Sequence, residues 1–335
     1  MIEFLWSLRR ASCLGSRAAI SRCALCSHQK RPPPIGELLV RGKHSQSKSK
    51  QRSQSSNKWL ERQRKDPYVG MAQDQGLPSR SSFKLQEINE LHYPNLLAKL
   101  EEKRKGNGSN HPYPRALIQP GALILDLGAA PGGWSLYAST QLKFDLGGAV
   151  VSVDLLSLDE TLHARNSDIT TRIRANLQSN FHFIQGDFTM NQTRERIMEA
   201  FTNVSNNTQN NYCTGKESCA IGRRPNLVLS DMAANFTGDS DTDAIRTLDL
   251  CERALAFAVG GSCFDRSYSA KEGQGVLEDG GVFLCKFFSC GKENEADLMD
   301  ASRRAFGSVH VLKPKASRKE SSEMYLLALG HKYAR

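Results

Sequence analysis

Glycines that follow an apolar run mark the segment best suited to bind a ligand. Residues 122–128 (ALILDLG) read as a buried strand, and Gly128, Gly132 and Gly133 lie in the turn before a helix-like segment. Ligands of open α/β sheets bind at the carboxyl ends of the strands, and a glycine lets the backbone approach a ligand because it has no Cβ. The spacing excludes the dinucleotide fingerprint G-x-G-x-x-G and the P-loop G-x-x-x-x-G-K-[ST]. Tight packing of the turn is the structural alternative.

Acidic residues recur near the ends of four successive predicted strands. They are Asp126, Asp154, Asp187 and Asp231. Because parallel strands end at the same edge of a sheet, we expect these carboxylates to converge on one rim. There they can accept hydrogen bonds from hydroxyl and amino groups and face a cationic centre. Each alone could instead cap a helix, but four in succession favour a ligand site.

Two lysines stand in contrasting sequence surroundings. Lys286 interrupts the apolar run 282–288 (VFLCKFF), where burying an ammonium group is costly unless the group is paired or neutral. A side chain that reaches solvent at the strand end is the structural alternative. Lys84, within 79–85 (SRSSFKL), reads as a surface helix lysine. A basic cluster before Glu323 suits phosphate, or forms an ordinary solvated loop; it consists of Lys313, Lys315, Arg318 and Lys319.

Alternating apolar and helix-like segments predict the elements that position these residues. The expected strands span 122–128, 149–156, 181–187, 227–233, 281–288, 308–314 and 323–330. The expected helices span 79–92, 133–143, 190–203, 241–259 and 293–306. The first, fourth and fifth strand segments are almost continuously apolar, as buried parallel strands are. The alternation predicts one doubly wound α/β domain.

Positive charge is concentrated at the N-terminus of this 335-residue chain, whose net charge is +10. Residues 1–60 hold 12 Lys and Arg against two acids, which leaves 33 residues of each sign in the remainder. Residues 1–45 are rich in Arg and Ser without a long apolar run, which predicts a mitochondrial transit peptide. A chloroplast transit peptide and a basic RNA-binding arm are the alternatives. Residues 46–58 read as a polar linker and 59–335 as the folded domain.

Several function classes are excluded by the composition. No segment approaches the roughly 18 apolar residues of a spanning helix, so we expect no membrane insertion. Nine irregularly spaced cysteines predict reduced thiols rather than a disulfide framework. Cys23 and Cys26 have the spacing of half a zinc site without a second pair, so we expect no metal. Polar insertions are expected at 101–115, 203–220 and 260–279.

The segments in this order resemble the FtsJ/RrmJ family of S-adenosylmethionine-dependent ribose 2′-O-methyltransferases, which act on large-subunit ribosomal RNA. The resemblance runs from residue 66 to about residue 330. Together with the leader, it indicates similarity to a mitochondrial member of the family. It is carried by DPYV (66–69), SRSSFKL (79–85), DLGAAPGGWS (126–135), SDMAAN (230–235), Lys286 and KPKASR…SSEMY (313–325). It implies a single Rossmann-like methyltransferase domain with a mostly parallel seven-stranded sheet and helices on both faces.

The resemblance also implies the site residues. The catalytic tetrad would be Lys84, Asp231, Lys286 and Glu323, with Lys286 as proton acceptor. S-adenosylmethionine contacts would be Gly128, Pro131, Gly132, Gly133, Trp134, Asp154, Asp187 and Asp231. Beside these implied residues, the expected RNA contacts are Arg80, Lys313, Lys315 and Arg318.

Charge neighbours bear on the implied role of Lys286. A lysine accepts a proton only in its neutral form, which burial and a positive Lys84 favour and the Asp231 carboxylate opposes. Asp231 is therefore expected to orient Lys286 and the cofactor, and Glu323 to position Lys84 or the ribose. Ala234 stands where the family usually has proline, a departure that could loosen the loop after the fourth strand.

The implied partner is large-subunit ribosomal RNA or a pre-ribosomal particle, bound by a monomer in the mitochondrial matrix. Family analogy suggests a uridine of the peptidyl-transferase A-loop as the target. A non-catalytic RNA-binding assembly factor on the same fold and an RNA-cap 2′-O-methyltransferase are the alternatives. An assembly factor could lack a tetrad member, and a cap enzyme should carry a cap-binding module for which this chain has no room.

Overall fold

The structure is a computed structural model, and it divides the chain into two units, Met1–Arg52 and Ser53–Arg335. The residues it describes all belong to the second unit. They are residues 61, 64, 66–75, 77–104, 113–143, 146–158, 181–212, 223–265 and 275–332. The predicted leader 1–45 and linker 46–58 lie outside the described residues, as do parts of all three predicted insertions.

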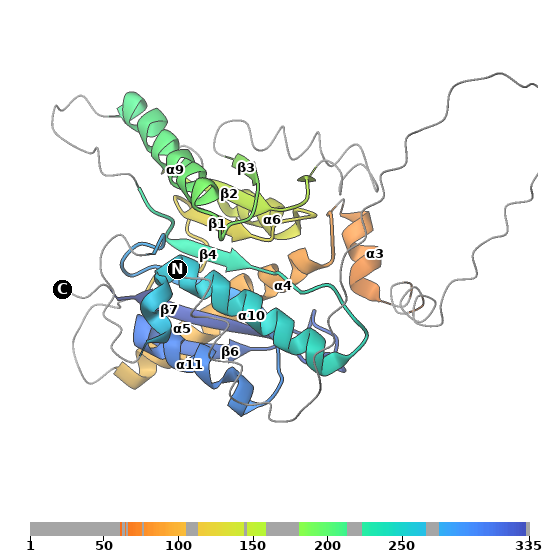
Figure 1. The fold of residues 1–335 in the computed structure, drawn as a ribbon. Helices are drawn as coiled ribbons and strands as arrows, with labels where there is room; N and C mark the ends of the chain where they lie inside the picture. The colour runs from red at the N-terminus through yellow and green to blue at the C-terminus, as the bar shows by residue number, and fades with distance from the viewer. Residues whose placement is uncertain are drawn as a thin grey trace, which may run out of the picture. The chain divides into compact units, whose positions relative to one another are not determined.

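A seven-stranded sheet runs through the described residues in the order β3-β2-β1-β4-β5-β7-β6 (Figure 1). The strands are β1 (Leu123–Leu127), β2 (Ala149–Asp154), β3 (Phe181–Gln185), β4 (Leu227–Ser230), β5 (Val282–Phe288), β6 (Phe306–Leu312) and β7 (Glu323–His331). All neighbours pair in parallel except β7, which is antiparallel to β5 and β6. The predicted mostly parallel sheet is confirmed, and its order reverses between β1 and β4, where a ligand crevice is expected.

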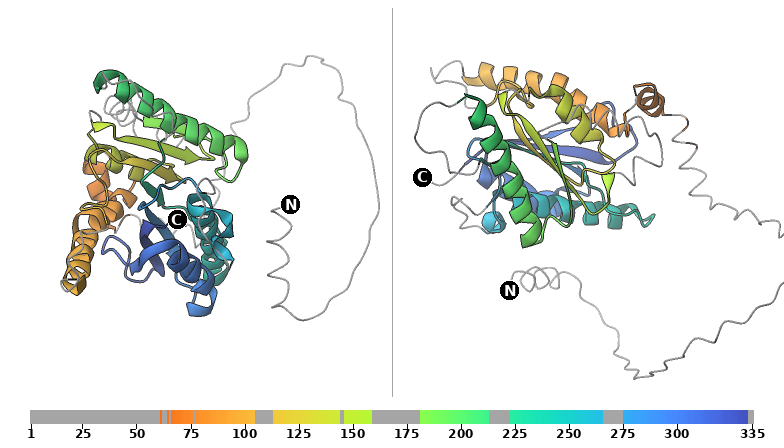
Figure 2. Two further views of the ribbon diagram at one scale, coloured as in Figure 1. Left: turned by 90° about the vertical axis from the view of Figure 1, so that its left-hand side faces the viewer. Right: turned by 90° about the horizontal axis from the view of Figure 1, so that it is seen from above.

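Helices cover both faces of this sheet (Figure 2). On one face lie α4 (Ser81–Glu87), the π-helical turn η1 (Ile88–His92), α5 (Tyr93–Arg104) and α6 (Gly133–Gln141). On the other lie α9 (Asn191–Tyr212), α10 (Ser240–Val259), the 3₁₀ turn η3 (Gly261–Phe264) and α11 (Lys292–Ala305). Helix α3 (Pro67–Asp74) packs beside α4.

Strand alternation explains the two cores. Leu123, Leu125 and Leu127 of β1 pack with α9, α10 and α11, whereas Ile124 packs with α4, α5 and α6. Successive side chains of a strand point to opposite faces, so a strand covered on both sides must be apolar throughout. The predicted burial of the first, fourth and fifth strands is confirmed.

Two predicted helices differ from the structure by more than two residues at one end. The segment predicted as one helix over 79–92 is α4, η1 and α5, and it continues to Arg104. The buried residues Leu85, Ile88, Tyr93 and Leu97 include one five-residue step, and a π-helical turn absorbs such a step without turning Tyr93 away from the core. The helix predicted over 190–203 extends as α9 to Tyr212, into the predicted insertion.

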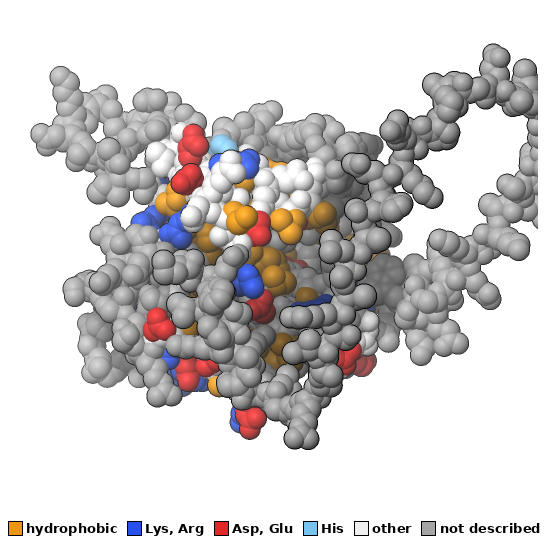
Figure 3. All heavy atoms as spheres, in the orientation of Figure 1, with side chains coloured by type: hydrophobic (Ala, Val, Ile, Leu, Met, Phe, Trp, Pro, Cys, Tyr) orange, Lys and Arg blue, Asp and Glu red, His pale blue; other side chains and the backbone are white. Residues whose placement is uncertain are grey.

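Cys251 of α10 and Cys285 of β5 form a disulfide, so the prediction of reduced thiols is wrong for this pair. Acidic and basic side chains are interspersed over the described part of the face in Figure 3, as the equal numbers of each sign beyond residue 60 lead one to expect. Of the described helices, none is long and apolar enough to cross a membrane.

Candidate active site

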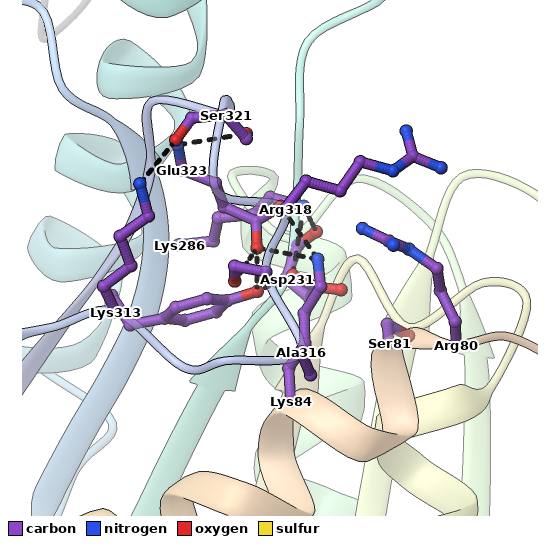
Figure 4. A network of polar contacts seen from close by, with 12 residues as sticks. Arg80, Ser81, Lys84, Asp231, Lys286, Lys313, Ala316, Arg318, Ser321 and Glu323 are labelled. Atoms are coloured by element: carbon purple, nitrogen blue, oxygen red, sulfur yellow. Dashed lines mark hydrogen bonds and ion pairs between the residues drawn. The ribbon is translucent and has the colours of Figure 1, made fainter. Parts of the chain in front are cut away.

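Four predicted catalytic residues meet at the carboxyl edge of β4 and β5 (Figure 4). Asp231 directly follows β4, and Lys286 lies near the end of β5. Because β7 runs antiparallel to β5, its first residue, Glu323, reaches the same edge and pairs opposite Phe288. Helix α4 supplies Lys84. The sheet topology therefore brings together residues that are up to 239 positions apart.

The four charges form two ion pairs, one buried and one partly buried. Lys84 Nζ lies 2.8 Å from both carboxylate oxygens of Glu323. Lys286 Nζ lies 3.0 Å from Asp231 Oδ1 and donates to the Asp231 backbone carbonyl. The reading of Lys84 as a surface lysine is wrong, since it is only 5% exposed. A solvent-directed Lys286 is also excluded, because its nitrogen points at Asp231 and the residue is buried.

Glu323 is an ionised carboxylate throughout the neutral range. Burial alone would raise its pKa, but the positive charges of Lys84 and Lys286 outweigh burial and lower the pKa to about 2. Such a weak base takes no proton from a substrate near pH 7. Glu323 is therefore suited to hold Lys84, while Lys286 presents its amine at the rim.

Tyr325 is a functional residue that sequence reasoning missed. Its hydroxyl lies 3.1 Å from both Asp231 Oδ1 and Glu323 Oε1, and so bridges the two ion pairs. Burial, followed by these two carboxylates, raises the pKa of Tyr325 well above its usual value, so the hydroxyl remains a donor. The available signal was its position two residues after Glu323, because residues i and i+2 of one strand lie on the same face of the sheet.

The basic loop 313–321 is fastened to this site. Ser317 donates to Glu323 Oε1 at 2.6 Å, a contact that sequence reasoning also missed. The Glu87 carboxylate accepts the backbone N–H groups of Lys315 and Ala316 at 2.8 and 2.9 Å. The loop therefore has a fixed conformation beside the ion pairs.

Three of the four predicted RNA contacts have partners within the chain. Arg80 and Arg318 both form ion pairs with the buried Asp66, the N-cap of α3. Lys313 donates to the backbone carbonyls of residues 319 and 321. The side chain of Lys315 is exposed. These contacts hold the loop in place and leave positive charge along its outer side.

The three predicted turn glycines differ in the space that an added Cβ would have. Gly132 has φ +102°, a conformation that side-chain-bearing residues rarely adopt, and an added Cβ would meet only Leu158 Cδ2 at 3.7 Å. Gly128 has φ +73°, and a Cβ there would overlap Met232. A Cβ on Gly133 would overlap Ser79 and Ser81. The packing alternative thus explains Gly128 and Gly133, and Gly132 remains the open position.

The other predicted cofactor contacts lie around this turn. Asp154 ends β2 and accepts the N–H groups of Ala130 and Leu156, each at 2.8 Å, which ties the strand end to the turn. Pro131 is half-buried in the turn. Trp134 is only 2% exposed and donates to the Ser81 carbonyl, so it is a core residue. Asp187 lies two residues beyond β3, is exposed, and accepts from the backbone and hydroxyl of Thr189.

Asp126 has an unusual environment. It lies within β1 rather than at its end, is only 1% exposed, and accepts from Ser135 through one oxygen while Oδ1 has no hydrogen-bond partner. Burial raises its pKa to about 7, and the negative charges of Asp231 and Asp154 add to the effect. An unsatisfied carboxylate oxygen beside two further carboxylates fits a positively charged group at the turn. Within the described ranges, no three His, Cys, Asp or Glu side chains are grouped to hold a metal ion.

The sheet, the glycine turn and the buried lysine together are typical of an α/β methyltransferase. Comparison with known proteins supports this class. Residues 77–331 match the family described as FtsJ-like methyltransferase, and the chain belongs to this family. It is 35% identical over 277 residues to the ribosomal RNA large subunit methyltransferase E of Rhodopseudomonas palustris, covering 82% of this chain and 85% of that protein.

A second relative and one solved structure are also similar to this chain. The Rickettsia conorii protein with that name is 34% identical over 287 residues, which cover 85% of this chain and 92% of the relative. The crystal structure of a ribosomal RNA methyltransferase from Plasmodium falciparum aligns with 71% of this chain and 97% of that one, with a TM-score of 0.39 and 17% identity.

The Asp126 environment predicts a pH-dependent stability. With its pKa raised from 3.8 to about 7, the folded state holds a proton that the unfolded state releases, so stability falls as pH rises between about 4 and 7. Asp126→Asn removes this dependence, which amounts at most to about 1.4 kcal/mol per pH unit. Urea unfolding from pH 5 to 8 measures it, with the exposed Asp300→Asn as control. Parallel curves for wild type and Asp126→Asn would contradict the assignment.

Proposed function

We propose that this chain is an S-adenosylmethionine-dependent ribose 2′-O-methyltransferase whose substrate is a uridine of large-subunit ribosomal RNA. The observation that carries the proposal is the amine of Lys286, held by Asp231 at the rim and joined through Tyr325 to the Lys84–Glu323 pair. The relatives named as ribosomal RNA large subunit methyltransferase E support the choice of substrate. We propose further that the chain acts as a monomer.

The residues at the turn fit the cofactor. When bound, S-adenosylmethionine supplies an activated methyl group on a positively charged sulfonium. Gly132 leaves open backbone at the turn, and Asp126 Oδ1 is buried without a hydrogen-bond partner. Asp154 and Asp231 add negative charge beside Asp126. A cation is the ligand that the carboxylates around this turn favour, so Gly132, Asp154 and Asp231 would hold it.

The proton of the ribose 2′-hydroxyl goes to Lys286. In its neutral form Lys286 Nζ carries a lone pair; as the O–H bond breaks, an N–H bond forms and the amine becomes an ammonium group. Asp231 Oδ1, at 3.0 Å, then stabilises this positive charge. Lys84, kept in place by Glu323 and Ser317, supplies a second positive charge for the developing negative oxygen.

Replacing Lys286 should abolish the reaction without unfolding the protein. Lys286→Met keeps the apolar stem, and Asp231 keeps the Tyr325 hydroxyl as donor. We expect methyl transfer to fall about 10²–10⁴-fold, the usual contribution of a positioned base, while cofactor affinity persists. Lys286→Arg should be equally inactive, because a guanidinium stays protonated.

Single-turnover transfer to large-subunit ribosomal RNA, followed by mapping of the 2′-O-methyl group, measures this effect. Lys292→Met, at an exposed lysine of α11, is the matched control. Near-normal rates for Lys286→Met or Lys286→Arg would contradict the assignment and leave Asp231 as the candidate base. A wild-type protein that binds this RNA but transfers no methyl group would favour a non-catalytic assembly factor.

Gly132→Val tests the cofactor site. A branched side chain at φ +102° is strained and fills the open position, so we expect cofactor affinity to fall at least tenfold. Gly280→Val is the control, since Gly280 also has a positive φ, +76°, with nothing within 4 Å of an added Cβ, and precedes β5 at the opposite edge. Calorimetric titration with S-adenosylmethionine should separate the two variants, and equal affinities would contradict the site.

We propose the mitochondrial matrix as the location, because residues 1–60 carry a net charge of +10 and are poor in acids. A fluorescent protein fused behind residues 1–50 should enter mitochondria. Replacing the arginines at 9, 10, 17 and 22 with glutamine should leave the fusion in the cytosol. A diffuse signal from the unaltered fusion would contradict the proposal, and accumulation in plastids would support the chloroplast alternative.

A further inference from the structure

We propose that Phe236 is a stacking platform for a base of the RNA substrate. This inference rests on the proposed function and deepens it. Phe236 is 70% exposed, the highest value among the large hydrophobic residues of the described ranges. Single exposed hydrophobic residues are common and carry no argument alone. The position of this ring and the rigidity of its loop carry the proposal.

The ring stands beside the tetrad. Phe236 belongs to the segment 231–239 that begins with Asp231, and its ring contacts that of Phe288 with a centroid distance of 6.0 Å and an interplanar angle of 60°. Phe288 lies two residues after Lys286 on β5, so the two side chains share a face of the sheet. Phe288 also pairs directly opposite Glu323. The Phe236–Phe288 ring pair therefore continues the rim on which Lys286 presents its amine.

The loop that carries Phe236 is fixed on both sides. The backbone N–H and hydroxyl of Thr237 donate to Asp243 Oδ1 at 2.7 and 2.8 Å. On the other side, the N–H of Ala234 donates to Thr247 Oγ1 at 3.2 Å. A proline at position 234 would have no such N–H, so the alanine gives the loop a hydrogen bond and the expectation of a loosened loop is not met.

An exposed aromatic ring on a loop that is already held binds at lower entropic cost, because the loop loses little backbone freedom. Burial of Phe236 is not what holds the loop, since the hydrogen bonds to Asp243 and Thr247 do so. The ring is thus held in water next to a site that must receive a ribose. Apolar stacking is the interaction it offers.

An RNA base is the ligand that fits this surface. Single-stranded nucleotides are recognised by stacking of their bases on aromatic side chains together with positive charge along the backbone. Here Phe236 supplies the aromatic face. The basic loop 313–321, fastened to Glu323 through Ser317, supplies the charge beside the tetrad. A ribose positioned at Lys286 would place its own or the adjacent base at Phe236.

Binding to paired RNA probes tests the proposal. Stacking contributes about 1–3 kcal/mol per base, so Phe236→Ala should weaken binding of a ten-residue oligouridylate about 5–150-fold. Binding of the same ribose–phosphate chain without bases should change less than about twofold, because that probe has nothing to stack. Phe236→Trp should retain the affinity, and Phe236→Leu should lose most of it. Fluorescence anisotropy at fixed low salt measures the affinity of wild type and of each variant for both probes.

Leu146→Ala is the control, since Leu146 is 57% exposed and lies before β2 at the opposite edge of the sheet. It should leave both affinities unchanged. Equal losses on the two probes for Phe236→Ala, or no loss on either, would overturn the proposal. Full affinity in Phe236→Leu would also overturn it, since a general apolar contact, such as one for a protein partner, would then explain the exposure.

Measuring methyl transfer beside oligouridylate binding distinguishes failure of the stacking platform from failure of the proposed function. In Phe236→Ala we expect a KM for ribosomal RNA raised by a similar factor, with cofactor affinity unchanged. If wild type transfers no methyl group to the RNA while oligouridylate binding still depends on Phe236, the proposed function fails and the platform stands. If wild type is active and Phe236→Ala has unaltered KM and unaltered binding, the platform fails and the proposed function stands.

Discussion

Two lysines and two carboxylates, three of the four buried and Asp231 partly exposed, meet at one sheet edge and are the constraint on which the rest of this structure depends. A buried charge left with no partner destabilises a fold by several kcal/mol, and here each carboxylate has a second partner besides its lysine, the Tyr325 hydroxyl. Tyr325 joins the pairs by placing one hydroxyl 3.1 Å from both carboxylates. The antiparallel direction of β7 brings its first residue, Glu323, to the carboxyl edge of β5. Stability and the placement of the Lys286 amine therefore depend on the same contacts.

The surroundings of the pairs extend this logic outward. Ser317 anchors the basic loop to Glu323, and Glu87 and Asp66 hold the loop against α4 and α3. On the other side, Asp243 and Thr247 fix the segment that follows Asp231. Both borders of the site are thus rigid before any substrate arrives. Such preorganisation lowers the cost of aligning a hydroxyl group with an incoming methyl group.

The sequence predicted the sheet and its order of elements because apolar periodicity is a local signal. The resemblance located the tetrad, but residue chemistry alone placed Lys84 on the surface. Its partner Glu323 lies 239 residues away, and such long-range pairing leaves no local pattern. The Asp66–Arg318 pair and the Cys251–Cys285 disulfide were missed for the same reason. The roles of Gly128 and Gly133 depend on neighbours that only the folded chain supplies.

The central claim is that Lys286 accepts the proton of the ribose hydroxyl, and chemical rescue tests it most directly. In Lys286→Ala the ammonium site beside Asp231 becomes a small cavity that an added amine can enter. Single-turnover methyl transfer to large-subunit ribosomal RNA is then measured with increasing methylamine, and with tetramethylammonium as a cation without a lone pair. The account predicts a rate that rises with the concentration of neutral methylamine and does not respond to tetramethylammonium. No rescue by methylamine, or equal rescue by both compounds, would contradict it.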